Sequence, residues 1–237
     1  MKRFYKTASL GEANGGHTVL LDGRPVRTPA KQEMLIPSRP VAEAVAAEWL
    51  AQGEEIQPAS MPLQRLVNTA LDIVAVNRGQ VVDNLAGYGD TDLLYYFAET
   101  PADLQQAQDE AWRPVLSWAE RQFAVTLRTV AGIGYIAQDA GALAALRRAV
   151  EAHDDMELAA LNDLVSITGS LLLGLAHSGA ALPLDGLWRA ARVDEDYQAG
   201  RWGWDSDAAR QAERRRGEVE QAARFLALHR TGRPGAA

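Results

Sequence analysis

Apolar and polar positions come in short runs near the start of the chain and in helical stripes after it. Asp22-Gly23 stands between two of the short runs. An Asp-Gly pair in that setting is the strongest short-range signal of a β-hairpin. We therefore predict a small antiparallel sheet of three or four strands within residues 2–37. The strands are expected in the short runs 3–10, 17–21, 24–28 and 33–36.

A helix should follow this sheet directly. Val41, Val45 and Trp49 recur four residues apart, which places them on one face of a helix. So few strands cannot bury themselves, and this helix should cover one face of the sheet. We therefore assign Trp49 to the fold, together with the turn residues Asp22 and Gly23.

From residue 60 onward the apolar pattern is overwhelmingly helical. Ser60 is expected to cap one helix and Asp139 another. Residues 158–176 are apolar almost all round, which is typical of a helix buried among others. The sequence predicts an α+β protein: a β-rich N-terminal domain over residues 1–59 and a larger, all-helical C-terminal domain over residues 60–237.

Composition excludes several classes of function. The 237 residues contain no cysteine, which removes disulfides, thiolate metal sites and cysteine nucleophiles. The net charge of -7 argues against a protein that coats nucleic acid or an anionic membrane. The uncharged run 164–176 is shorter than the roughly 20 apolar residues of a membrane span. No apolar leader follows Lys2, Arg3 and Lys6, so we expect a cytoplasmic protein without a signal peptide.

Two enzymatic alternatives rest on short motifs. Gly132–Ala137 has the pattern G-x-G-x-x-A, and two aspartates follow it at the distance expected of a dinucleotide site. A pyrophosphate would need a helix that begins at Gly134, whereas Asp139 is the better N-cap. A plain glycine-rich connector is therefore the favoured interpretation, and a nucleotide-dependent enzyme the alternative.

Asp83, Asp90 and Asp92 suggest a metal-dependent hydrolase, because hard cations bind clustered carboxylates. Asp90 and Asp92 are explained equally well as residues that cap the apolar segment after residue 92. The four histidines are scattered, and we expect neither a catalytic group nor a metal or other cofactor.

The segment from Val193 to Trp204 is the most distinctive. Asp194, Glu195 and Asp196 fall within one helical turn, and Trp202-Gly-Trp204 follows. Runs of charge usually face water, which is the plain interpretation. A tryptophan pair around glycine can instead present an exposed apolar patch to a partner.

Several segments resemble the assembly chaperones of the F1 ATP synthase alpha subunit. They occur in the family's order from residue 3 to about residue 204, and Arg113 departs from the aspartate that many members carry. The matching segments are 3–6, 21–29, 46–49, 60–63, 91–94, 108–118 and 195–203.

The resemblance implies a two-domain chaperone that holds the unassembled alpha subunit without hydrolysing nucleotide, until the beta subunit takes its place. The partner would be that subunit, contacted through Asp194, Glu195, Asp196, Trp202 and Trp204. Without a mitochondrial transit peptide, the chain suits a bacterial relative of the mitochondrial members.

Overall fold

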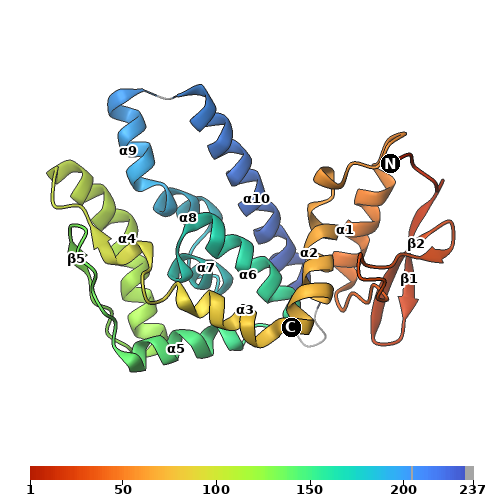
Figure 1. The fold of residues 1–237 in the computed structure, drawn as a ribbon, viewed down its shortest axis with the longest axis horizontal. Helices are drawn as coiled ribbons and strands as arrows, with labels where there is room; N and C mark the ends of the chain where they lie inside the picture. The colour runs from red at the N-terminus through yellow and green to blue at the C-terminus, as the bar shows by residue number, and fades with distance from the viewer. Residues whose placement is uncertain (204, 233–237) are drawn as a thin grey trace. The chain divides into compact units, whose positions relative to one another are not determined.

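The computed structural model describes residues 1–203 and 205–232 (Figure 1). Its contacts divide the chain into two compact units. The first unit contains residues 1–78, 154–160 and 221–232, and the second contains residues 79–153 and 161–220. The sequence predicts a domain boundary between residues 59 and 60. These contact-based units do not test whether residues 1–59 fold independently, so that boundary stays a prediction.

The first unit begins with a three-stranded antiparallel sheet, as predicted. Its strands β1 (Ala8–Ala13), β2 (Gly16–Leu21) and β3 (Arg24–Pro25) lie in sequence order. Asp22 and Gly23 form the β2–β3 turn with φ of 47° and 78°, the left-handed conformation that a two-residue type I′ turn requires. The predicted hairpin at Asp22-Gly23 is therefore confirmed.

The strand limits differ from those predicted. β1 begins at Ala8 because the Asp22 carboxylate binds the backbone N–H groups of Thr7 and Lys6, at 2.8 and 3.0 Å. These hydrogen bonds, that of Thr7 foremost, lower the pKa of Asp22. β3 ends at Pro25, which has no N–H to donate to a ladder. The runs 24–28 and 33–36 otherwise contribute only isolated bridges, Arg27 to Glu33 and His17 to Ile36.

Helix α1 (Arg39–Leu50) packs on β1 and β2 (Figure 1). Val41 and Val45 are fully buried, which confirms the predicted covering helix. Trp49 lies at the end of the same stripe but is only half-buried. Its indole N–H donates to the Gln64 side chain at 2.7 Å, and its ring meets Tyr5 edge-on at 5.5 Å.

Helix α2 (Pro62–Thr69) follows the 3-10 turn Pro58–Ser60, and its N-cap residue is Met61. The expected Ser60 cap is wrong: the Ser60 hydroxyl donates to the Gln57 carbonyl at 2.8 Å. Glu48 of α1 caps α2 instead, since its two carboxylate oxygens accept from the N–H groups of Leu63 and Gln64 at 2.9 and 2.8 Å. Burial raises the pKa of Glu48 despite these hydrogen bonds.

The rest of the chain is mostly helical, and helix makes up 62% of the structure. The predicted α+β fold class is therefore confirmed. The elements after α2 are a π-helical turn (Ala70–Val74), α3 (Ala75–Gly87), a 3-10 turn (Leu93–Tyr95), β4 (Tyr96–Phe97), α4 (Ala102–Phe123), β5 (Val130–Ala131), α5 (Ala140–Glu151), α6 (Asp155–Thr168), α7 (Leu171–Ser178), α8 (Leu184–Ala191), α9 (Val193–Trp202) and α10 (Ser206–Thr231).

The apolar run 158–176 is divided between the end of α6 and α7, which are separated at Gly169 and Ser170, and α7 is buried as predicted. Leu171 to Ala176 are buried, and Gly174 lets the helix approach the end of α6. A Cβ added at Gly174 would lie 2.8 Å from the Val165 side chain, so only glycine fits there without a shift.

Long helix α4 packs against α7, α8 and α9 in the same unit. Its buried Trp112 donates the indole N–H to the Ala190 carbonyl, at the end of α8, over 2.7 Å. This contact sets the position from which α9 starts. In the part of the chain that the structure describes, no helix has both the length and the apolar character that a bilayer crossing demands.

Candidate functional site

Helix α9 carries the acidic segment that the sequence singles out. Asp194, Glu195 and Asp196 occupy its first turn, where negative charge favours the positive end of the helix dipole. Gly203, with φ of 88°, ends the helix. Local physics alone thus accounts for part of this charge cluster.

Buried Arg192 organises two of the three carboxylates. Its guanidinium lies 3.0 Å from Glu195 and 2.9 Å from Asp196, three and four residues further along. The same group lies over the Trp188 ring at 5.3 Å. Only 9% of the Arg192 side chain is exposed, whereas 53% of the Glu195 side chain is. The ion pair therefore presents its negative end to solvent.

Asp194 has a different partner. Its carboxylate accepts from the Gln108 side-chain amide at 2.6 Å, and the Gln108 amide oxygen accepts from the Ala98 N–H at 2.7 Å. Because Gln108 lies on α4 and is buried, Asp194 fastens α9 to that helix. The three adjacent carboxylates are thus not equivalent. Of the two that pair with Arg192, the Glu195 side chain is more exposed than that of Asp196.

The far end of α9 is fastened to α4 as well. Asp103 accepts a hydrogen bond from the Tyr197 hydroxyl at 2.7 Å and pairs with Arg201 at 3.0 Å. The Tyr197 hydrogen bond, followed by the charge of Arg201, holds the pKa of Asp103 below its usual value. These contacts hold the second half of α9 against α4.

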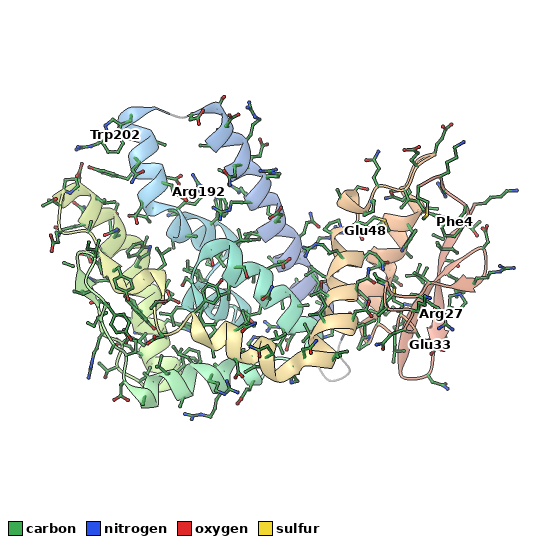
Figure 2. All side chains as sticks on the ribbon, viewed as in Figure 1. Phe4, Arg27, Glu33, Glu48, Arg192 and Trp202 are labelled. Carbon is green, nitrogen blue, oxygen red and sulfur yellow. The ribbon has the colours of Figure 1, made fainter. Side chains whose placement is uncertain are left out.

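A groove of about 360 Å³ lies between α9 and the start of α10. Glu195 lines it near the start of α9. Trp202, labelled in Figure 2, lines it at the other end of this helix. The Trp202 side chain is 77% exposed, the largest ring in the described chain with so little cover. Trp204, expected to join this surface, lies outside the described residues. Arg215 of α10 faces the same groove.

The groove therefore combines an apolar ring with a half-exposed carboxylate. That pairing suits a protein surface with an apolar patch beside a basic group. Among residues 1–203 and 205–232, no three His, Asp or Glu side chains are grouped so that they could hold a metal ion.

Comparison with known proteins gives the family. The sequence model of the ATP12 chaperone protein family matches residues 2–120. The chain belongs to the ATP12 chaperone family. It is thereby placed among F1-ATPase assembly factors, and the resemblance described above is confirmed.

Relatives of known structure and sequence extend the likeness over almost the whole chain. The crystal structure of Atp12 from Paracoccus denitrificans is 40% identical, with a TM-score of 0.92 over 96% of this chain and 98% of that one. A structure from Agrobacterium tumefaciens is 37% identical, with a TM-score of 0.92 over 96% and 85%. The mitochondrial protein atp12 of Schizosaccharomyces pombe is 25% identical over 225 residues, 87% of this chain and 75% of its own.

In this ATP12-family chain the glycine-rich segment is a connector. The strand directly before it is β5, which pairs in parallel with β4, and helix α5 begins only at Ala140. Asp139 caps α5 by accepting from the Gly141 N–H at 2.7 Å, as predicted. A carboxylate thus occupies the helix end where a pyrophosphate would have to sit. Asp154 and Asp155, the two aspartates that follow the motif, pair with His229 and Arg78.

The three aspartates of the metal-dependent alternative have separate partners. Asp83 pairs with Arg147, and Asp90 accepts from the Tyr135 hydroxyl at 3.1 Å. Asp92 is fully buried and accepts from the Ser170 hydroxyl at 2.7 Å and from the Leu172 and Leu94 N–H groups at 3.0 and 3.1 Å. Burial raises the pKa of Asp92 to about 6. Capping explains Asp92, and neither enzymatic alternative is supported.

The sequence singles out Glu195 and Trp202, whereas the roles of Arg192 and Gln108 in holding the acidic turn come from the structure. The signal for Arg192 was present, since a cation three and four residues before two carboxylates favours helical ion pairs. Gln108 is 86 residues from Asp194, and no local pattern links them.

Proposed function

We propose that this chain holds the unassembled alpha subunit of the F1 ATP synthase in the bacterial cytoplasm and promotes F1 assembly without hydrolysing nucleotide. Membership of the ATP12 chaperone family supports the general role. The physical task would be to cover an apolar subunit interface that aggregates when left exposed.

The exposed indole of Trp202 is the observation that carries this proposal. A large ring 77% open to water has little value for the fold, and such rings are frequent anchors of protein interfaces. Glu195, on the same groove, supplies a charge whose complement would be a basic group of the client.

The other predicted contact residues have supporting roles in this proposal. Asp194 and Asp196 hold α9 through Gln108 and Arg192, and so orient the surface on which the client rests. Trp204 stays a proposed contact residue on the ground of the sequence alone. The proposed anchor and charge are therefore carried by one helix, α9, whose position α4 fixes through two separate contacts.

Separate expression of alpha and beta subunits with the tagged chain tests the proposal. The chain should retain the alpha subunit and little of the beta subunit or of assembled F1, and added ATP should not be needed. Equal retention of alpha and beta subunits would overturn the proposed client. The purified chain should show no ATPase activity above background, and a measurable activity would refute the proposal that the chain hydrolyses no nucleotide.

A further inference from the structure

The first unit contains a second recess, distinct from the groove on α9. It has a volume of about 580 Å³ and lies among the segment after β3, the end of α1 and the start of α2. Ile56 and Met61 are buried at its base, and the half-buried ring of Trp49 forms part of its wall.

Polar groups in this recess are already paired within the chain. The Thr28 hydroxyl donates to Asp72 at 2.6 Å, the Trp49 indole to Gln64 at 2.7 Å, and the Gln64 amide to Asn68 at 2.9 Å. A polar small molecule needs several unpaired groups that converge on it. The recess offers an apolar surface instead, which favours an apolar side chain as its occupant.

The charge around the recess is opposite to that of the whole chain. Arg27 and Arg65 line it, and none of its lining residues is Asp or Glu; Asp72, which accepts from the Thr28 hydroxyl, lies behind that lining. Arg27, labelled in Figure 2, follows β3 and is exposed. The net charge of the chain is -7, so a basic rim stands out against it. An occupant with a carboxylate beside its apolar side chain would match both features.

Three of the segments that carry the family resemblance meet at this recess. Arg27 to Pro29 belong to the segment 21–29, Trp49 ends the segment 46–49, and Met61 lies in the segment 60–63. The match to the family model, over residues 2–120, also contains every lining residue of the recess except Met1, whereas it ends before α9. These matches support a role for the recess in the chaperone that is separate from the role of α9.

We infer that this recess binds a segment of the alpha subunit that presents a large apolar side chain next to an acidic one. The inference rests on the proposed function, because the client named there supplies the segment. The segment enters as an anchor: its apolar side chain fills the space over Met61, and its carboxylate lies against Arg27.

Filling the recess tests the apolar part of this inference. Ala59 is exposed and lines the recess, so Ala59→Trp should occupy the space and lower the apparent affinity for alpha subunit at least about tenfold. Ala51→Trp is the matched control, because Ala51 is exposed in the same unit and does not line the recess. Melting curves establish that both variants fold.

Charge reversal tests the acidic part. Arg27→Glu should weaken capture by a similar factor, whereas Arg24→Glu, at an exposed arginine outside the recess, should leave capture unchanged. If wild-type chain captures alpha subunit and both recess variants capture it equally well, the inference is wrong and the proposed function stands. If wild-type chain captures no alpha subunit, the proposed function fails first, and the inference falls with it.

Discussion

Arg192 and Glu195 form an ion pair of 3.0 Å in which the cation is buried and the anion is half exposed. Asp196 pairs with the same guanidinium at 2.9 Å, so two carboxylates share one positive charge. Negative charge therefore remains at the surface of α9. Glu195 can meet a partner without leaving Arg192 unneutralised, which is the geometry that the proposed client contact needs.

Trp202 should matter for binding and not for stability. Because its ring is 77% exposed, Trp202→Ala should change the free energy of unfolding by no more than about 0.5 kcal/mol. The same change should cost about 2 kcal/mol of binding free energy for alpha subunit if the ring is an anchor. Binding titrations and urea unfolding measure the two quantities. Phe4→Ala, at an exposed ring in the other unit, should alter neither by much; a comparable loss of affinity there would remove the special role of Trp202.

Asp92 should make stability depend on pH in an unusual direction. Its pKa is raised to about 6 in the fold, from about 4 in the unfolded chain, so the folded state binds this proton more tightly. The contribution of Asp92 to stability is therefore largest below pH 4 and is lost as pH rises toward 6. Relative to Asp92→Asn, the wild-type chain should lose up to about 3 kcal/mol between pH 4 and pH 7.

Urea unfolding at several pH values measures this difference. Asp207→Asn, at an exposed carboxylate of α10, controls for the general effect of removing a surface charge. A difference between wild type and Asp92→Asn that stays constant with pH would show that the Asp92 carboxyl ionises normally despite its burial.

Glu48 should stabilise α2 more than Ser60 does. Glu48→Ala removes the acceptor of two N–H groups at the start of the helix, and should cost about 1–2 kcal/mol. Ser60→Ala should cost less, because the Ser60 hydroxyl donates to a turn carbonyl and caps no helix. Thermal or urea unfolding of both variants measures the two losses of stability. A larger loss of stability for Ser60→Ala than for Glu48→Ala would identify Ser60 as the cap of α2.

Features that depend on neighbouring residues were predictable from the sequence. The turn at Asp22-Gly23 requires only two residues that tolerate positive φ, and the Asp139 cap requires only the N–H of Gly141. The turn residues between short apolar runs likewise predicted the sheet, and the spacing of Val41, Val45 and Trp49 predicted its covering helix. These features are local, so a local pattern identifies them.

Features set by distant residues were not predictable. Glu48 caps α2 from another helix, which no pattern around Ser60 reveals. β1 begins late because Asp22, fifteen residues from Thr7, takes the N–H groups ahead of the strand. Trp49 continues the apolar stripe of α1 but lies near the end of the helix and is only half-buried. At the candidate site, the sequence identified the acidic turn, whereas only the fold distinguishes Asp194, which holds α4, from Glu195.

The direct test of the account is one variant measured in two ways. Glu195→Lys places a positive charge beside Arg192, but Asp196 still pairs with that guanidinium. We expect a loss of only about 1 kcal/mol in stability, since half-exposed ion pairs contribute little. Facing a basic group of the client, the new lysine should cost several kcal/mol of binding. Glu195→Gln isolates the loss of charge, and Glu218→Lys, at an exposed site on α10, controls for net charge.

The decisive measurement is the fraction of alpha subunit that each variant keeps soluble, taken beside its melting temperature. Glu195→Lys should melt within a few degrees of wild type and yet fail to keep alpha subunit soluble, while Glu218→Lys should perform like wild type. A folded Glu195→Lys chain that keeps as much alpha subunit soluble as wild type does would contradict the account.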